Sequence, residues 1–251
     1  MRYFIKFSYL GAPFHGWQSQ PNAMSVQQTL EEAMATILRV PVPVTGAGRT
    51  DTGVNARVMY AHFDTAEPVA DPRRFLQGLN RLCGPAIALH ELIPVHDDAH
   101  ARFDATLRTY RYFVTFDKSP FLAPLSWHSP SPLDRDAMNR GAEVLLHTDD
   151  FTSFAKLHSD TKTNICRVSE ARWDTWTNDY GMPGIVFTIS ADRFLRNMVR
   201  AVVGTLVDMG RGKLSLDGLR DIIDRRDRCS AGTSMPPQAL FLWDIAYPFI
   251  T

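Results

Sequence analysis

Residues 107–116, LRTYRYFVTF, decide how the chain is organised, because they begin a second series of predicted strands and helices. Alternate side chains in this segment are aromatic or β-branched, and alternate side chains point to the same face of a strand. They are Tyr110, Tyr112, Val114 and Phe116. A strand that starts the pattern again in mid-chain indicates a second lobe.

The part of the chain before residue 107 alternates strands with helices. Apolar and β-branched segments predict strands over residues 1–10, 57–64 and 86–95. One helix is expected after Ser25, which has Gln28 at the capping-box position. Another is expected over residues 71–83, with Asp71 as the N-cap and Pro72 as the first helical residue. The order is therefore β-α-β-α-β.

The second series is longer and ends on a strand. Its predicted strands are residues 107–116, 165–176, 184–190 and 240–247, of which the middle two form a hairpin. Its predicted helices are residues 133–147, residues 194–210 and a segment that begins after Ser215. Together the two series predict an α+β protein with two similar lobes, residues 1–104 and 105–251. A cleft between the lobes is the expected place for a functional site.

The composition indicates a folded, cytoplasmic protein. Of the 251 residues 45% are hydrophobic, which is enough for a substantial core. No apolar run approaches the roughly 18 residues that span a bilayer, and the first ten residues do not resemble a signal peptide. Cys83, Cys166 and Cys229 are far apart and form no CxxC pair, so we expect thiols rather than disulfides or a zinc ribbon.

The charge balance leaves nucleic-acid binding open. The formal net charge is zero, whereas proteins that neutralise phosphates usually carry a basic surplus. The 27 basic residues nevertheless include only five lysines, so 22 are arginines. Arginine makes bidentate contacts with phosphates and bases and stacks on rings, so one arginine-rich face could bind RNA. Ordinary surface ion pairs are the alternative.

Residues 46–55, GAGRTDTGVN, concentrate polar side chains between ordered segments. Asp51 stands where a dinucleotide-binding motif needs its third glycine, and a strand rather than a helix follows. The segment also lacks the G-K-[ST] of a phosphate-binding loop. Two interpretations remain: an ordinary glycine turn in which Asp51 bonds its own backbone, or a loop that presents Asp51 as a nucleophile or base.

A catalytic carboxylate needs groups that position it and set its pKa. Arg196 and Arg200 lie four apart on a predicted helix, where they could hold an anion or extend to solvent. A buried Asp51–Arg200 pair would keep the carboxylate ionised, and removing one partner would cost roughly 3–5 kcal/mol. Tyr110 lies between arginines and could stack on an unpaired RNA base, although a tyrosine in an alternating strand is commonly part of a core.

One further segment could indicate a metal site. Residues 96–100, HDDAH, supply two histidines and two aspartates. Histidines four apart suit a metal when they share a helix face, but this segment lies between two predicted strands. A metal-dependent hydrolase that uses His96 and His100 is therefore kept as an alternative only.

Residues 46–64, GAGRTDTGVNARVMYAHFD, closely resemble the signature of the tRNA pseudouridine synthase A family, whose loop runs G-R-T-D-x-G-V-H. Other segments resemble the motifs of that family in the same order. They are FHGWQSQP with SVQQTLEEA, HARFDATLRTYRY, DDFTSFAK, FLRNMVRAVVG and ALFLWDIAYP. The resemblance extends from about residue 3 to residue 248 and implies a continuous, mostly antiparallel sheet flanked by helices.

The resemblance also assigns roles to single residues. It implies that Asp51 is the catalytic aspartate, Tyr110 the active-site tyrosine and Arg200 the basic partner. Arg49 matches the arginine associated with flipping the target base and taking its place, and Leu240 matches an apolar residue of the pocket. Where the family commonly has histidine, this chain has Asn55, which can still donate and accept hydrogen bonds.

The implied reaction is isomerisation of uridine to pseudouridine, at positions 38 to 40 of the tRNA anticodon stem-loop. A homodimer that needs no cofactor and no metal is expected to carry it out. The uracil would leave its stack to reach Asp51, with Tyr110 stacking on it and Arg49 filling the gap. Apolar walls such as Leu240, with Val199 nearby, would keep water from the detached base. A non-catalytic RNA-binding protein is the remaining alternative.

Overall fold

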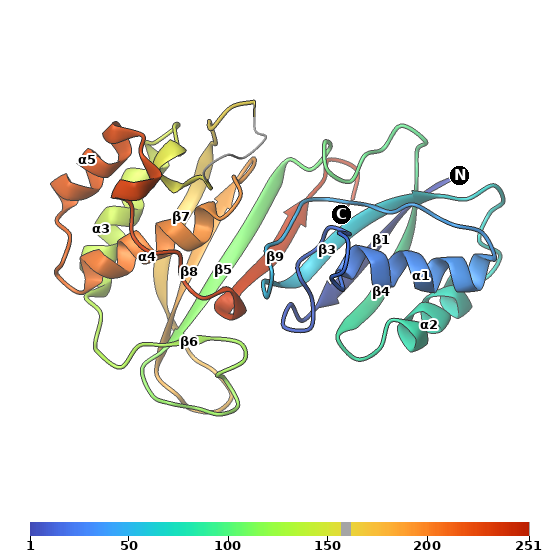
Figure 1. Ribbon diagram of the computed structural model, residues 1–251, viewed down its shortest axis with the longest axis horizontal. Helices are drawn as coiled ribbons and strands as arrows, with labels where there is room; N and C mark the ends of the chain where they lie inside the picture. The colour runs from blue at the N-terminus through green and yellow to red at the C-terminus, as the bar shows by residue number, and fades with distance from the viewer. Residues whose placement is uncertain (157–161, 251) are drawn as a thin grey trace. The chain divides into compact units, whose positions relative to one another are not determined.

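The computed structural model describes residues 1–156 and 162–250 (Figure 1). It confirms an α+β protein, in which a mixed sheet of several strands is flanked by helices. The chain forms two compact units, Met1–Thr106 with Leu242–Thr251 and Leu107–Phe241. Each unit is described by itself below. The return of the last residues to the first unit is a feature that the sequence patterns do not predict.

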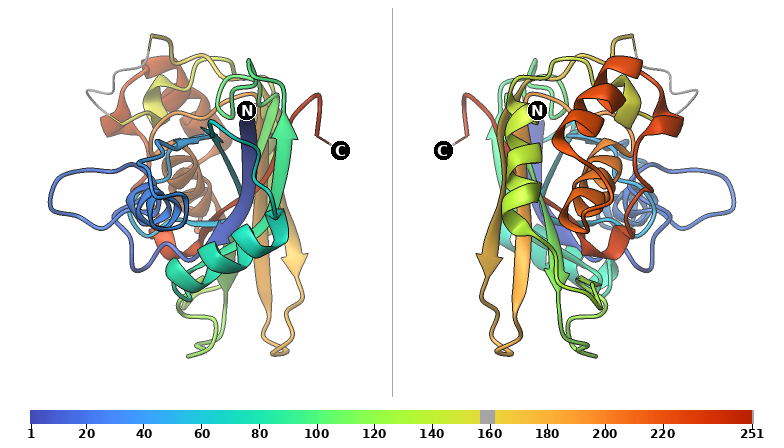
Figure 2. Two further views of the ribbon diagram at one scale, coloured as in Figure 1. Left: turned by 90° about the vertical axis from the view of Figure 1, so that its right-hand side faces the viewer. Right: turned by 90° about the vertical axis from the view of Figure 1, so that its left-hand side faces the viewer.

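The first unit contains four antiparallel strands of the sheet and two helices. Its strands are β1 (Arg2–Tyr9), β2 (Thr45–Gly46), β3 (Asn55–Asp64) and β4 (Ile87–Val95), and its helices are α1 (Val26–Leu38) and α2 (Pro72–Leu82). The order is β4-β1-β3, with β2 added to β3. The helix α2 packs against both β4 and α1 (Figure 2, left). The predicted order of strands and helices is confirmed, and only the two-residue β2 was missed.

One face of the central strand β1 is buried along its whole length, by Tyr3, Ile5, Phe7 and Tyr9, and on the other face Phe4 is buried. Phe7 stacks near Trp17 on one face, with a distance of 5.8 Å between the ring centroids. On the other face Phe4 meets the edge of Tyr247 at 5.2 Å. The Tyr247 hydroxyl donates to the Ala101 carbonyl, so ring packing and a buried hydrogen bond hold the end of the chain in this unit.

The second unit contains four strands of the sheet, the start of a fifth, and three helices. Its strands are β5 (Leu107–Thr115), β6 (Trp127–His128), β7 (Val168–Trp176) and β8 (Gly184–Ala191), and β9 (Leu240–Ala246) begins in it. Its helices are α3 (Arg135–Leu146), α4 (Met198–Gly210) and α5 (Leu216–Arg225), with short 3-10 turns at Thr152–Phe154, Arg228–Ser230 and Pro237–Ala239. The order is β5-β8-β7, all antiparallel, with β6 parallel to β5.

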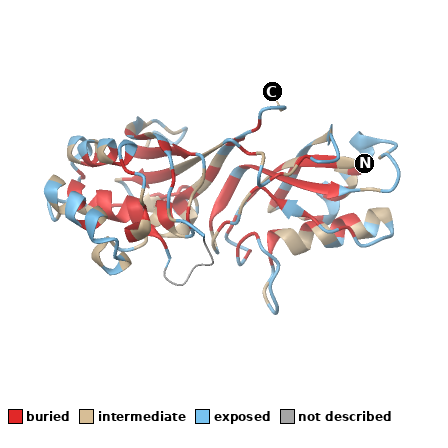
Figure 3. Cartoon of the chain, turned by 90° about the horizontal axis from the view of Figure 1, so that it is seen from above, coloured by how far each residue is buried: buried red, intermediate tan, exposed pale blue. Residues whose placement is uncertain are grey.

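Helix packing in the second unit follows the burial of its side chains. The helix α3 lies along β7 and also contacts α4 (Figure 2, right). Buried residues run along the strands of the sheet, and α4 is buried at almost every position (Figure 3).

Within the part of the chain that the structure describes, no helix has the length and hydrophobicity needed to cross a bilayer.

One predicted helix begins later than expected. The apolar pattern predicts a helix over residues 194–210, but α4 begins at Met198. Asn197 takes the left-handed conformation with φ of 66°, which asparagine tolerates and which interrupts a right-handed helix. Arg196 therefore lies before the helix, and the expected pairing of Arg196 with Arg200 on one helix face is wrong.

The buried cap of α1 gives a test of this fold. The Ser25 side chain is fully buried and accepts a hydrogen bond from the Gln28 N–H, as the sequence predicts. We expect Ser25→Ala to lower the free energy of unfolding by about 1–2 kcal/mol, because the amide loses its acceptor away from water. Ser215 caps α5 in the same way but is exposed, so water can replace its oxygen and Ser215→Ala is expected to cost less. Urea denaturation measures both, and equal losses would contradict the effect of burial.

Candidate active site

The loop that carries Asp51 connects two paired strands of the first unit. Thr45 and Gly46 of β2 pair with His62 and Ala61 of β3, and the Ala47 N–H donates to the Tyr60 carbonyl at 2.8 Å. Across the loop, the Val54 N–H donates to the Asp51 carbonyl at 3.1 Å. The loop is short, and hydrogen bonds between the strands fix both of its ends. The sheet therefore sets the position of the loop.

A second loop, residues 10–17, holds the Asp51 loop in place by direct backbone contact. A Cβ atom added to Gly11 would lie 2.3 Å from the Val54 carbonyl oxygen. At Gly16, whose φ is +91°, it would lie 2.5 Å from the carbonyl oxygen of Thr50. The same Thr50 carbonyl accepts from the Trp17 N–H at 3.3 Å. Side chains at these two glycines would push the loops apart, so residues 10–17 need glycine at both positions.

Two polar side chains of the Asp51 loop point inward and anchor it. The Thr50 hydroxyl shares a buried hydrogen bond of 2.8 Å with the Tyr9 hydroxyl. The Asn55 side chain is 2% exposed, and its oxygen accepts from the Gly11 N–H at 2.8 Å. Asn55 therefore ties the two loops together through a buried hydrogen bond.

The remaining polar side chains of the loop are more accessible. Asp51 is half-buried, whereas Arg49 and Thr52 are exposed. Residues on either side of Asp51 are thus divided between anchoring the loop and facing outward. An ordinary solvent-exposed turn does not need two buried anchors and two glycine contacts, so the structure favours a loop that presents the carboxylate.

Tyr110 lies in the second unit, on β5 opposite Ile189 of β8. It is half-buried, and its ring meets Phe194 edge-to-face, with centroids 5.0 Å apart and an interplanar angle of 84°. Two residues further along, Tyr112 is fully buried and its hydroxyl donates to the Pro236 carbonyl at 3.1 Å. Burial raises the pKa of Tyr112 well above its usual value. Tyr112 is therefore the core tyrosine of this strand, and Tyr110 retains an accessible side.

Phe194 is a residue that sequence reasoning missed. The apolar pattern assigned it to a helix, whereas it lies in the segment between β8 and α4 and supports the ring of Tyr110. An aromatic pair of this geometry contributes about 0.5–1.5 kcal/mol beyond the area that it buries. The only sequence signal was a phenylalanine placed before an asparagine that can interrupt a helix.

One interpretation of the sequence was that Arg200 extends to solvent, but in the structure it does not. It is half-buried in the first turn of α4, and its Nε donates to the Met235 carbonyl at 2.6 Å. In return the Met235 N–H donates to the Arg200 carbonyl at 3.1 Å. Arg196, in contrast, is exposed. Val199 and Leu240 are 4% and 5% exposed, so both belong to apolar packing near the ends of α4 and β9.

The two histidines of residues 96–100 have separate partners. The His96 ring contacts Phe249, and the His100 ring contacts His62 with centroids 4.6 Å apart. Burial, followed by the charges of His100 and Arg2, lowers the pKa of His62 to about 4. In residues 1–156 and 162–250 no group of three or more potential ligands is placed to hold a metal ion. The structure therefore gives the metal-dependent hydrolase no support.

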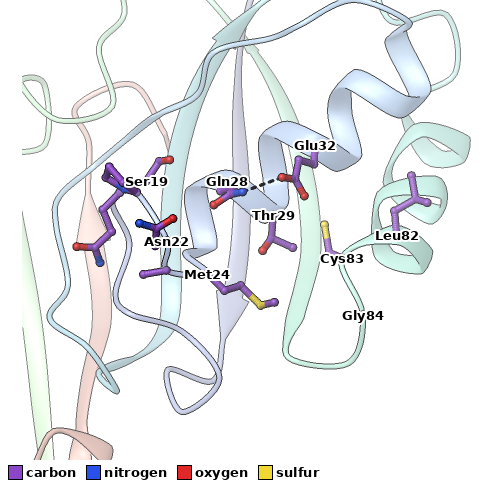
Figure 4. A pocket seen from close by; sticks show the side chains of 12 residues that line it. Ser19, Asn22, Met24, Gln28, Thr29, Glu32, Leu82, Cys83 and Gly84 are labelled. Carbon is purple, nitrogen blue, oxygen red and sulfur yellow. Dashed lines mark hydrogen bonds between the residues drawn. The ribbon is translucent and has the colours of Figure 1, made fainter.

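An open cavity of about 860 Å³ lies elsewhere in the first unit (Figure 4). It is lined by residues 19–24, by polar side chains of α1 and by the end of α2 with Cys83. Burial raises the pKa of the Cys83 thiol to about 11, so this sulfur is protonated at neutral pH and unsuited to act as a nucleophile. None of the predicted site residues lines this cavity.

The predicted site residues are thus carried by both units. Asp51 and Arg49 belong to the first unit, and Tyr110, Arg200 and Leu240 belong to the second. An α+β chain that presents an anchored carboxylate loop, a half-buried tyrosine and a fixed arginine fits an enzyme better than a passive binding surface. A family model described as tRNA pseudouridine synthase matches residues 142–248. Relatives that match nearly the whole chain carry the same description, so the class is that of the pseudouridine synthases, which are isomerases.

Similarity over nearly the whole chain identifies the family. The tRNA pseudouridine synthase A of Parabacteroides distasonis is 54% identical over 251 residues, which cover 98% of this chain and 96% of that protein. That of Bacteroides fragilis is 52% identical over 247 residues, covering 98% and 96%. That of Bacillus subtilis is 37% identical over 252 residues, covering 98% and 99%. The chain belongs to the tRNA pseudouridine synthase A family, as the sequence motifs predict.

The Asn55 hydrogen bond gives a test of the anchored loop. We expect Asn55→Ala to lower the free energy of unfolding by about 1–3 kcal/mol, because the buried Gly11 N–H loses its acceptor. Turnover should also fall, since the loop that carries Asp51 is no longer held. Urea denaturation and an assay of pseudouridine formation measure the two effects. Thr52→Ala, an exposed change in the same loop, is the control, and equal behaviour of the two variants would count against the anchor.

Proposed function

We propose that this enzyme converts uridine to pseudouridine in the anticodon stem-loop of tRNA, at positions 38 to 40, with Asp51 as the catalytic carboxylate. The observation that carries this proposal is the anchored loop, because Thr50 and Asn55 hold its backbone while Asp51 between them stays half-buried. Membership of the family supports the reaction and the substrate class. We place the reaction in the cytoplasm, where tRNA is modified, and expect no cofactor or metal.

The reaction requires one glycosidic bond to break and another to form. The N1–C1′ bond of uridine is cleaved, the uracil turns while bound, and C5 is joined to C1′. The proton on C5 is then lost and N1 gains one, so the product is an isomer of the substrate. Asp51 can serve either by attack on the sugar carbon or by removal of a proton, and both routes need an ionised carboxylate.

The other residues are proposed to bind the base and stabilise charge. Tyr110 is proposed to stack on the uracil, and Phe194 supports the Tyr110 ring by edge-to-face packing. Arg49 is exposed and is proposed to occupy the place of the extruded uridine. Arg200 is proposed to supply the positive charge that favours the ionised form of the catalytic carboxylate. Leu240 is proposed to exclude water from the detached base.

A homodimer is proposed as the active form, because the resemblance of the sequence motifs to the family implies one. A non-catalytic RNA-binding protein is the competing function, in which arginines would carry all activity through phosphate contacts. Membership of an isomerase family favours the enzyme. Light scattering tests the dimer, and Asp51→Asn separates the two functions.

Replacing the carboxylate of Asp51 is the direct test of the catalytic role. We expect Asp51→Asn to abolish tritium release from tRNA that carries 5-tritiated uridine, because an amide can neither attack the sugar nor accept the proton. Binding of tRNA should stay within a few-fold of the original protein. Asp97→Asn, an exposed carboxylate of the same unit, is the matched control and should leave turnover unchanged. Normal turnover by Asp51→Asn would overturn the proposed function.

Two changes at Tyr110 test stacking against hydrogen bonding. Tyr110→Ala is expected to lower kcat/KM by about 5- to 150-fold, because stacking of a base on an aromatic ring contributes about 1–3 kcal/mol. Tyr110→Phe keeps the ring and its contact with Phe194, so its loss should be much smaller. Steady-state kinetics with an anticodon stem-loop RNA measures both variants. Equal losses would show that the hydroxyl, not the ring, is what the reaction needs.

A further inference from the structure

Residues 228–236, which we call the strap, cross the N-terminal half of α4 in close contact with its backbone. A Cβ atom added to Gly204 of α4 would lie 1.9 Å from the Thr233 carbonyl oxygen. One added to Gly232 of the strap would lie 2.7 Å from the Thr205 nitrogen. The Gly232 N–H also donates to the Thr205 hydroxyl at 2.9 Å. Two glycines therefore let the strap approach the helix, and its path over α4 is fixed.

The strap holds Arg200 by its side chain and by its backbone. The Met235 carbonyl accepts from Nε of Arg200, and the Met235 N–H donates to the Arg200 carbonyl. Met235 itself is buried, and the next carbonyl, of Pro236, accepts from the Tyr112 hydroxyl. The strap therefore takes part in fixing the plane of the Arg200 guanidinium, because the Met235 carbonyl accepts from Nε, the nitrogen nearest to the stem of that plane.

The residue before Met235 has an unusual set of hydrogen bonds. The Ser234 hydroxyl accepts from Nδ2 of Asn197 at 2.7 Å and from Nη2 of Arg228 at 2.8 Å. Nη1 of Arg228 donates to the Gly232 carbonyl at 3.2 Å. Both lone pairs of the hydroxyl are therefore used, and one donor comes from the helix start and the other from the strap.

Asn197 makes this contact instead of capping α4. It occupies the N-cap position but takes the left-handed conformation, and its side chain makes no cap hydrogen bond. An asparagine at this position ordinarily satisfies an N–H of the first turn, which contributes about 1 kcal/mol. Here its amide donates to Ser234 instead. Asn197 therefore does not cap the helix but links the start of α4 to the strap.

We propose that Ser234, with Asn197 and Arg228, is a positioning residue that sets the guanidinium of Arg200 for the isomerisation. This inference rests on the proposed role of Arg200. Ser234 touches no reacting atom and acts through the neighbouring Met235 carbonyl. A misplacement of about 1 Å in a group that serves the reaction can cost on the order of 10²-fold in rate, so the contact affects turnover more than binding.

Removal of the hydroxyl tests the proposal. Ser234→Ala is expected to lower the single-turnover rate by about 10- to 100-fold while the Kd for tRNA changes by less than about 3-fold. Ser234→Thr retains the oxygen and should recover most of the rate. Ser234 is half-buried, and Ser126→Ala, which removes a buried hydroxyl of the same unit that donates to the Leu122 carbonyl, is the control for loss of a serine hydrogen bond. A purely structural Ser234 would give a loss of stability with an unchanged rate, as is expected for Ser126→Ala.

A double-mutant cycle separates this inference from the proposed function. In the Arg200→Ala background, Ser234→Ala should have no further effect on rate, because the group that it positions is absent. Full additivity of the two changes would overturn the positioning role. A slow Arg200→Ala with a normal Ser234→Ala would overturn only this inference. A normal rate for Arg200→Ala would overturn the proposed role of Arg200, and this inference with it. Circular dichroism confirms that each variant is folded before its rate is compared.

Discussion

The contact between two loop backbones is the constraint on which the candidate site depends. Residues 10–17 approach residues 50–54 so closely that a single Cβ atom at Gly11 or Gly16 would collide with a carbonyl oxygen. The polar groups at this contact are satisfied by Asn55 and by the pair of Tyr9 with Thr50. A loop held only by side-chain packing would allow its carboxylate to move, whereas backbone contact limits that movement. The position of Asp51 therefore depends on Gly11, Gly16 and Asn55, none of which is proposed to contact the substrate.

The second unit holds Arg200 by the same physical means. The strap approaches α4 at two glycines, and a buried or half-buried polar side chain ties the strap to the helix start. In both units glycine permits close approach and a hydrogen-bonded side chain fixes the register. Orientation of reacting groups before the reaction is a large part of the advantage that an enzyme has over free reactants in water. The supporting residues are thus expected to matter for rate as well as for stability.

Sequence periodicity predicted most strands and helices because burial in this protein is regular. The caps at Ser25, Asp71 and Ser215 were visible because capping uses a few residue types at fixed spacing. The start of α4 was not, since the apolar pattern continues through Phe194 while the backbone turns at Asn197. An asparagine in the left-handed conformation leaves no clear periodic signal. Likewise, the two-residue strands β2 and β6 are too short to show a pattern.

For the site, the sequence by itself determined which side chains are available: a carboxylate among glycines at Asp51, a tyrosine between arginines at Tyr110, and an arginine beside apolar residues at Arg200. The family could also be recognised from the sequence, because the residue types of the motifs, their spacing and their order along the chain are all properties of the sequence. Only the tertiary structure decided that Asn55 and Thr50 are anchors, that Tyr112 rather than Tyr110 is the core tyrosine, and that residues 242–250 complete the first unit. Each of these depends on contacts between residues far apart in the chain, and local composition does not encode such distances.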